Sequence, residues 1–128
     1  MSSLGNFVKR FKNVYFESSC NDTPAWIAFS SSFKRALKKD FKSSEFVEMK
    51  GHVGHFYLDG FLKHINGKWI YFCFPDVRFM ASGKKWYNDI LYREAKDEKD
   101  YYGGVNHYCT LADLLTKADE LVRAEASR

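Results

Sequence analysis

Residues 60–74 read GFLKHINGKWIYFCF, and this stretch decides the fold. Two runs rich in aromatic and apolar residues flank the pair Asn66-Gly67. Asn and Gly both tolerate a positive φ, so this pair between two such runs is the strongest short-range signal for a β-hairpin. We therefore expect two antiparallel strands, over residues 55–65 and 68–74, with a two-residue turn between them.

A two-residue turn also predicts which side chains face each other across the hairpin. It would place Lys63 opposite Ile70, Phe61 opposite Phe72 and, on the other side, Leu62 opposite Tyr71. Both faces of this hairpin would then be apolar or aromatic, whereas a half-exposed sheet has one polar face. Either other elements, or a second copy in a homodimer, cover both faces, or one face is a recognition surface. The second alternative assumes more apolar area than so small a chain can bury by itself.

Helices are predicted on both sides of the hairpin. The longest runs from Thr23 to Phe41, because Thr23 and Pro24 are typical of a helix start and apolar residues recur at helical spacing behind them. A shorter amphipathic helix is expected over residues 4–15, with a strand over residues 13–16 as the alternative for its last part. The last helix should begin at Thr110 and present one apolar face.

The segments between these elements give weaker signals. Residues 45–50 alternate in polarity and predict a short strand, and Gly51 and Gly54 predict a turn that contains His52. Residues 84–88 predict a short helix, and residues 89–95 could continue it or form another strand. The predicted fold class is α+β: one domain over residues 1–128, with a small antiparallel sheet around the central hairpin.

Composition limits the class of protein. Of the 128 residues 18% are aromatic, which suggests an aromatic core or an aromatic binding face. The three cysteines are odd in number and lack metal-ligand or redox spacing, so we expect reduced thiols and a cytoplasmic protein. No apolar run is long enough for a membrane span, and the first residues do not resemble a signal peptide.

Positive charge is concentrated in the first third of the chain. Residues 1–44 contain eight Lys and Arg against three Asp and Glu, a net charge of +5, whereas the whole chain has +4. Five of these cations belong to the predicted long helix: Lys34, Arg35, Lys38, Lys39 and Lys42. Such a face can attract phosphate or an acidic protein surface, or it can be the solvated side of the helix.

Several groups of residues are candidates for a site that carries chemistry. His52 and His55 form an HxxH pair that lacks the further ligands zinc needs. His107 and Cys109 are a possible base and nucleophile, but proximity in sequence does not align them for catalysis. Arg93 forms a charge cluster with nearby aspartates. We predict no catalytic residue, no metal and no cofactor.

The pairs Asp76 with Arg78 and Arg93 with Asp97 or Asp100 are typical of structural ion pairs. A metal-independent nuclease could still use His52 or His107, Arg93 and a tyrosine for acid–base chemistry and phosphate stabilisation. The chain contains no phosphate-binding loop, and Gly103-Gly104 predicts a tight turn.

Part of the chain resembles short uncharacterised reading frames of phages and mobile elements. The resemblance lies in residues 60–62, 66–72 and 76–78, and in the later residues 90–93, 99–101, 103–104 and 106. It assigns no catalytic or binding residue. It implies that the protein binds a host macromolecule, as defence inhibitors of the anti-CRISPR type do.

Three functions follow from these observations. The first is a non-enzymatic protein that binds a protein or nucleoprotein partner, with Trp69, Tyr71, Arg78, Trp86 and Tyr92 as predicted contacts. The second is a nucleic-acid-binding module that uses the basic helix and an aromatic strand face. The third is a small metal-independent nuclease or transferase.

Overall fold

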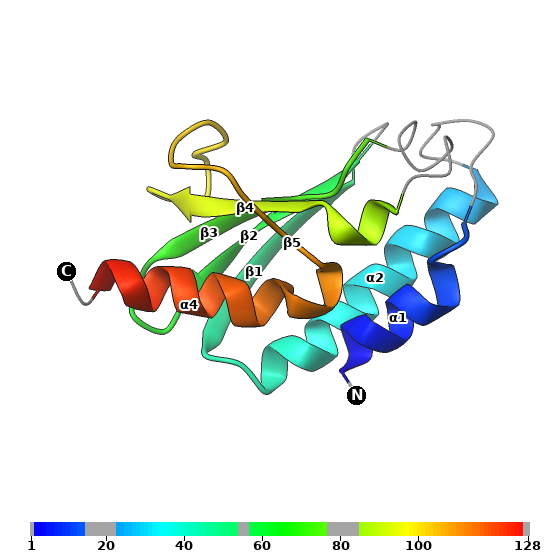
Figure 1. Ribbon diagram of the computed structural model, residues 1–128, viewed down its shortest axis with the longest axis horizontal. Helices are drawn as coiled ribbons and strands as arrows, with labels where there is room; N and C mark the ends of the chain where they lie inside the picture. The colour runs from blue at the N-terminus through cyan, green and yellow to red at the C-terminus, as the bar shows by residue number, and fades with distance from the viewer. Residues whose placement is uncertain (1, 15–22, 54–56, 77–84, 127–128) are drawn as a thin grey trace.

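The computed structural model describes residues 2–14, 23–53, 57–76 and 85–126. Two helices precede a five-stranded antiparallel sheet, and a third helix follows it (Figure 1). The elements are α1 (Ser3–Phe11), α2 (Pro24–Lys42), β1 (Phe46–Val53), β2 (Leu58–His64), β3 (Trp69–Cys73), η1 (Trp86–Asn88), β4 (Ile90–Ala95), β5 (His107–Cys109), η2 (Leu111–Asp113) and α4 (Leu114–Ala126). The predicted α+β class with a central hairpin is confirmed.

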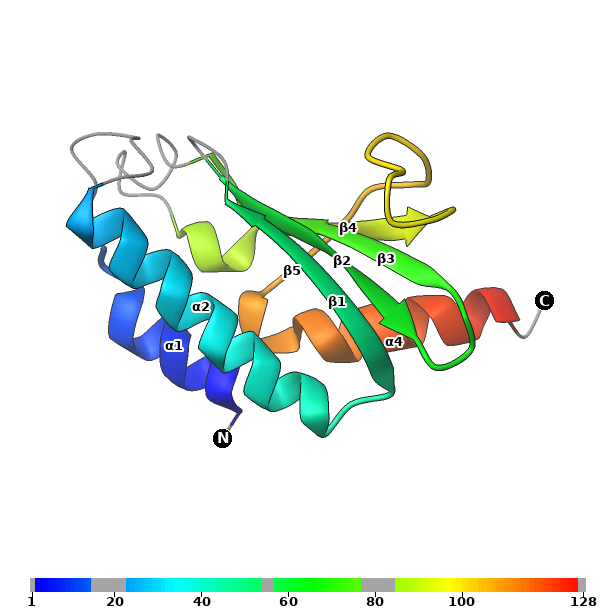
Figure 2. The ribbon, with the colours of Figure 1, turned by 180° about the vertical axis from the view of Figure 1, so that it is seen from behind.

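The sheet has the simplest possible order, β1-β2-β3-β4-β5, because each strand pairs with its neighbour in sequence. All three helices contribute to one core on a single face of this sheet. Its centre holds aromatic side chains such as Phe29, Phe33 and Trp86, with Phe29 and Trp86 only 5.2 Å apart between ring centroids. Figures 1 and 2 show the helices on one side of the sheet and the loop after β4 on the other.

The predicted boundaries of α2 and the start of α4 agree with the structure, but α1 ends at Phe11 and not near residue 15, because residues 12–14 are already turn and coil. Thr23 is the N-cap of α2 and Pro24 its first residue, and the helix ends at Lys42 rather than Phe41. At the other end of the chain Thr110 precedes a short 3-10 turn that leads into α4. Leu111, Leu114, Ala118 and Val122 from this region are fully buried.

The hairpin lies where it was predicted, but its register was wrong by one residue. Lys63 pairs with Trp69 and Phe61 with Tyr71, instead of with Ile70 and Phe72. The loop contains three residues, because the Gly67 amide donates to the His64 carbonyl and the His64 amide donates to the Lys68 carbonyl. Of the described residues only glycines have a positive φ, so Asn66 does not adopt the conformation that a two-residue turn requires.

Side-chain hydrogen bonds explain why the longer loop is preferred. The Lys68 amide donates to Oδ1 of Asn66 at 2.9 Å, and the Asn66 amide donates to Nδ1 of His64 at 3.2 Å. Within this loop only Gly67 adopts the left-handed conformation, with φ of +92°. This is the usual form of a three-residue hairpin loop, a turn closed by one glycine.

The remaining segments agree with their predictions only in part. β1 extends through Gly51 and His52, which were expected in a turn, because they pair with Gly60 and Asp59 of β2. β5 was not foreseen; its three residues pair with β4 and form the far edge of the sheet. The short helix predicted over residues 84–88 is a 3-10 turn at Trp86–Asn88, and of the two alternatives for residues 89–95 the strand is confirmed as β4.

The assumption of excess apolar area is contradicted. Trp69, Tyr71, Phe72 and Phe74 are at most 8% exposed in the single chain. Phe72 and Phe74 belong to the core under the helices, whereas Trp69 and Tyr71 lie on the opposite face in a second cluster with Phe61 and Ala95. Tyr101, from the loop after β4, packs edge-on against Phe61 and Tyr71 and helps to cover that face.

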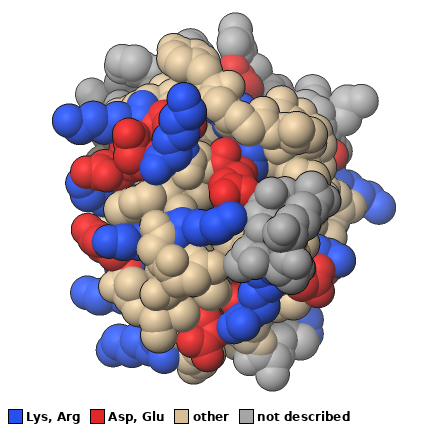
Figure 3. Space-filling view, turned by 90° about the vertical axis from the view of Figure 1, so that its left-hand side faces the viewer, with Lys and Arg blue, Asp and Glu red and all other residues tan. Residues whose placement is uncertain are grey.

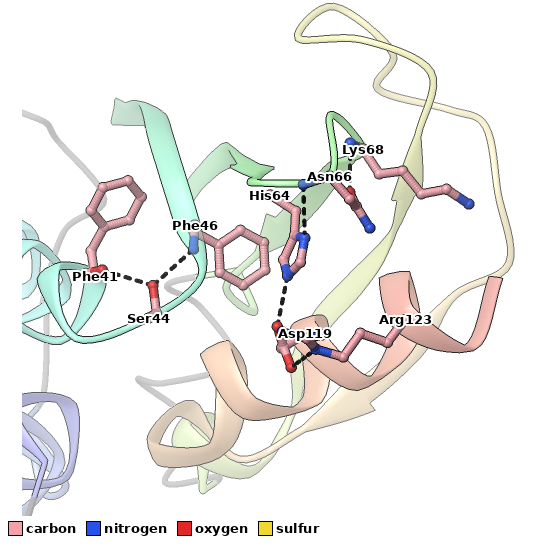
Figure 4. A network of polar contacts seen from close by, with 8 residues as sticks. All are labelled: Phe41, Ser44, Phe46, His64, Asn66, Lys68, Asp119 and Arg123. Atoms are coloured by element: carbon pink, nitrogen blue, oxygen red, sulfur yellow. Dashed lines mark hydrogen bonds and ion pairs between the residues drawn. The ribbon is translucent and has the colours of Figure 1, made fainter. Parts of the chain in front are cut away.

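A polar network attaches α4 to the hairpin (Figure 4). His64 is 2% exposed and its Nε2 lies 2.7 Å from Oδ1 of Asp119, whose other oxygen accepts from Nε of Arg123. Because Nδ1 of His64 accepts from the Asn66 amide, the proton of the imidazole belongs on Nε2 and points at Asp119. Burial raises the pKa of Asp119, but the hydrogen bonds from Arg123 and His64 outweigh it and hold that pKa below its ordinary value.

Gly60 and its cross-strand partner Gly51 allow a matched test of the packing between β1 and β2. A Cβ on Gly60 would lie 2.4 Å from the Lys50 carbonyl oxygen and 2.9 Å from the Phe72 ring, whereas a Cβ on Gly51 would meet nothing within 4 Å. We expect Gly60→Ala to lower the free energy of unfolding by about 1–3 kcal/mol. Gly51→Ala should be neutral or slightly stabilising, since it only restricts the unfolded chain. Urea unfolding measures both, and equal effects would contradict the packing described.

Removal of the Asp119 carboxylate should destabilise the protein by about 1–3 kcal/mol at neutral pH, because His64 loses a buried hydrogen-bond partner. The folded pKa of Asp119 is lowered, so its stabilisation is complete above its unfolded pKa and disappears as the pH falls through the folded value. The difference in the free energy of unfolding between wild type and Asp119→Ala, measured with urea, should therefore decrease from neutral pH to about pH 3. Glu120→Ala, which changes an exposed neighbour, is the control. A difference in the free energy of unfolding that does not change with pH would contradict the stabilisation by Asp119.

Candidate functional site

Basic side chains dominate the exposed surface of α1 and α2. The two helices contain seven Lys and Arg and one acidic residue, Asp40. The cations are all exposed: Lys9, Arg10, Lys34, Arg35, Lys38, Lys39 and Lys42. We call these seven residues the basic surface. The five cations predicted from the sequence on α2 therefore lie where a partner can reach them.

None of these seven cations forms an ion pair with any residue that the structure describes. The one polar side-chain contact among them joins Arg35 to the hydroxyl of Ser32 at 3.2 Å. Arg10 lies over the ring of Phe11, with its guanidinium carbon 5.1 Å from the centroid. Their charge is thus not neutralised within the described part of the chain.

Asp40 does not reduce this charge at the surface, because it is directed at the start of α1. Its two carboxylate oxygens accept from the amides of Ser3 and Leu4, each at 2.8 Å. The first amides of a helix have no partners within the helix and carry a partial positive charge. One carboxylate of α2 therefore caps α1, while Ser2 accepts from the next amide, that of Gly5.

The cap places α1 beside α2 and leaves a shallow groove between them. The cavity has a volume of about 250 Å³, and Arg10, Arg35 and Lys39 line it together with the apolar Phe7 and Phe11. The contribution of Lys9 and Arg10 to the basic surface was not predicted from the sequence. Helical spacing in α1 shows which of its residues face the core, but the position of Arg10 beside Arg35 depends on how the helices pack.

The end of the molecule at the hairpin turn differs from the basic surface. Figure 3 shows it from the side of the C-terminal end of α4, and there Lys and Arg alternate with Asp and Glu. Several of these charges are paired, as in Lys68 with Glu94 and Lys50 with Glu98, both at 3.3 Å. A surface of mixed sign is the common state of a globular protein.

The residues predicted as aromatic contacts do not form a surface. Trp86 is 1% exposed, and Trp69, Tyr71 and Tyr92 are 7–8% exposed, so the isolated chain offers little of them to a partner. The reason is that the sheet is covered on both faces, by the helices on one and by Tyr101 and its loop on part of the other. Arg78, the fifth predicted contact, lies outside the described residues.

The candidate catalytic groups are not assembled into one site. His52 is on β1 and His107 on β5, at opposite edges of the sheet. Four strand spacings of about 4.8 Å separate these edges, roughly 19 Å. Arg93 is on β4, where it donates to Oδ1 of Asn106. His55 lies outside the described residues, so the HxxH pair stays a sequence observation.

Cys109 does not have the character of a nucleophile. It is 9% exposed, and burial raises the pKa of its thiol to about 12. A thiolate is the reactive form of cysteine, and this environment disfavours it. His107 instead packs against Tyr92, with ring centroids 5.3 Å apart.

Comparisons with known proteins place the chain in no family: no family model, no curated protein and no solved structure matches it. Among the described residues, no helix is both long enough and apolar enough to cross a bilayer. The basic surface on α1 and α2 is therefore judged on its geometry and charge alone.

The cap by Asp40 should stabilise α1, the helix that contributes Lys9 and Arg10 to the basic surface. Asp40→Ala removes two charge-assisted hydrogen bonds and should lower the free energy of unfolding by about 1–3 kcal/mol. Asp40→Asn keeps one acceptor oxygen and should retain part of this stability. Hydrogen exchange of the α1 amides checks the assignment: faster exchange confined to α1 supports it, and unchanged exchange in Asp40→Ala contradicts it.

Proposed function

We propose that this protein is a non-enzymatic binding module whose basic surface contacts the phosphate backbone of a nucleic acid, free or within a nucleoprotein complex. The observation that carries the proposal is the set of seven exposed cations without an ion-pair partner among the described residues. Their one acidic neighbour in the two helices is engaged in capping α1.

The arrangement of the cations suits a linear polyanion. Lys34, Lys38 and Lys42 recur every four residues on α2 and so form a row along one side of the helix. At 1.5 Å per residue this row is about 12 Å long, enough to follow several phosphates of a single strand. Arg10, Arg35 and Lys39 line the adjacent groove and add further donors beside the row.

Backbone contacts of this kind bind without reading the base sequence. Stacking of bases on an aromatic strand face, the other part of the nucleic-acid-binding prediction, lacks support because Trp69 and Tyr71 of strand β3 are buried. Electrostatic contact with phosphates is the part that the geometry favours. The resemblance to phage and mobile-element reading frames favours a host nucleoprotein, such as a defence complex, as the natural target.

Fluorescence anisotropy with labelled single-stranded DNA, duplex DNA and RNA tests this function. The affinity should fall steeply with salt, because each neutralised phosphate of a single strand contributes about −0.7 to the slope of log K against log[KCl]. The triple variant Arg35→Ala/Lys38→Ala/Lys39→Ala should weaken binding and make the slope shallower by about 2.

A second triple variant controls for net charge. Lys96→Ala/Lys99→Ala/Lys117→Ala removes the same charge from exposed positions outside the basic surface and should leave the slope close to that of the wild type. Absence of binding at low salt, or equal effects of the two triple variants, would refute the proposal. Binding to an acidic polypeptide but to no nucleic acid would refute it in favour of an acidic protein partner. The labelled strands should remain uncut with and without chelator, and cleavage would revive the nuclease alternative.

A further inference from the structure

A second concave site lies on the sheet face opposite the helices. The cavity has a volume of about 310 Å³, near the lower end of the range of about 300–1,000 Å³ that is common for ligand pockets. Four of its seven lining residues are tyrosines, and the others are His52, Asp59 and Cys73. This site shares no residue with the basic surface.

Asp59 is the one carboxylate that lines this cavity, and only one of its two oxygens accepts a hydrogen bond from the described residues. Its side chain is 4% exposed, and Oδ2 accepts a hydrogen bond from the hydroxyl of Tyr71 at 2.8 Å. Oδ1 is buried and accepts no hydrogen bond from the described residues. Nδ1 of the exposed His52 lies 3.3 Å from it, an ion pair when the imidazole is protonated. The imidazole of His52 supplies positive charge only when it is protonated, and a buried carboxylate favours a cation beside it.

The remaining walls add aromatic surface but no second negative charge. Burial raises the pKa of the Cys73 thiol to about 11, with the Tyr71 hydroxyl and Asp59 among the groups around it, so this wall is neutral. Burial, and next the charge of Asp59, raise the pKa of Tyr57. The site therefore combines one buried carboxylate with several electron-rich ring faces.

The outer wall is held in place by the loop after β4. Oδ1 of Asp100 accepts from the amides of Tyr102 and Gly103, and Oδ2 accepts from the amide of Lys96. Tyr101 is fixed on one side by its edge-on contacts with Phe61 and Tyr71. Tyr102 is 94% exposed and makes no ring contact with the part of the chain that the structure describes, so its ring is available to close over a bound molecule.

From these observations we infer that this cavity binds an organic ammonium ion, with the charge beside the carboxylate of Asp59 and the alkyl groups against the rings of Tyr57, Tyr101 and Tyr102. Aromatic rings attract such cations through the negative charge of their faces, and alkylated ammonium ions lose little hydration on binding. Among the described residues no group of three His, Cys, Asp or Glu side chains could hold a metal ion. The same sheet already contains such a contact, because Arg93 lies over Tyr71 with its guanidinium carbon 4.7 Å from the ring centroid.

The test is an NMR titration of the full chain with tetramethylammonium chloride, with KCl at equal concentration as the reference. Saturable shift changes should concentrate at residues 52, 57–59, 71–73 and 101–102, and KCl should not produce them. Tyr102→Ala should weaken binding by about threefold, the effect of one exposed cation–π contact, and Asp59→Asn by about tenfold or more.

Should Asp59→Asn fail to fold, Tyr102→Ala still tests the site, because Tyr102 is 94% exposed and its removal should not disturb the fold. Tyr108→Ala is its matched control: this tyrosine is also exposed, at 61%, but belongs to β5 and not to the cavity. It should leave the affinity unchanged.

A second ligand, acetylated trimethyllysine amide, identifies the source of the cation. Tighter binding than tetramethylammonium indicates the side chain of a partner polypeptide, and equal binding indicates a free amine; either result supports the site. Failure of both ligands to give saturable shifts would overturn the inference. So would an affinity that neither Tyr102→Ala nor Asp59→Asn changes.

Discussion

The three-residue loop of the β2–β3 hairpin determines the two faces of the sheet. Its closure by Gly67 makes residues 59, 61 and 63 of β2 face the odd-numbered residues of β3 rather than the even-numbered ones. Ile70 and Phe72 then lie under the helices, whereas Trp69 and Tyr71 lie on the opposite face. A shift by one residue would exchange these sets, and Ile70 and Phe72 would leave the core under the helices.

The same register determines which polar side chains meet on each face of the sheet. On the helix side, His64 is directed at Asp119 and joins the end of the hairpin to α4. On the other side, Asp59, Tyr71 and Cys73 come together at the cavity whose outer wall is the loop after β4. The basic surface belongs to neither face of the sheet. It lies on the outer side of α1 and α2, where the apolar stripes of both helices are turned inward and their cations outward.

Local signals in the sequence predicted the elements well, because each depends on neighbouring residues. The start of α2 at Thr23 and Pro24 and the turn at Asn66-Gly67 are of this kind. The register was not predictable in the same way, since it depends on side-chain hydrogen bonds of Asn66 and His64 that form only in the folded loop. β5 was missed because three residues give no measurable alternation. Of the functional residues, the cations of α2 follow from helical spacing, whereas the meeting of Asp59 with Tyr101 and Tyr102 depends on a loop some forty residues away in the chain.

Both faces of the sheet depend on the register of the hairpin. Cross-strand NOEs between backbone protons of β2 and β3 test this register most directly. The structure predicts that the NOEs connect Phe61 with Tyr71 and Lys63 with Trp69. NOEs that instead connect Phe61 with Phe72 and Lys63 with Ile70 would show a two-residue turn. They would contradict the assignment of both faces, and with it the helix core and the tyrosine-lined cavity.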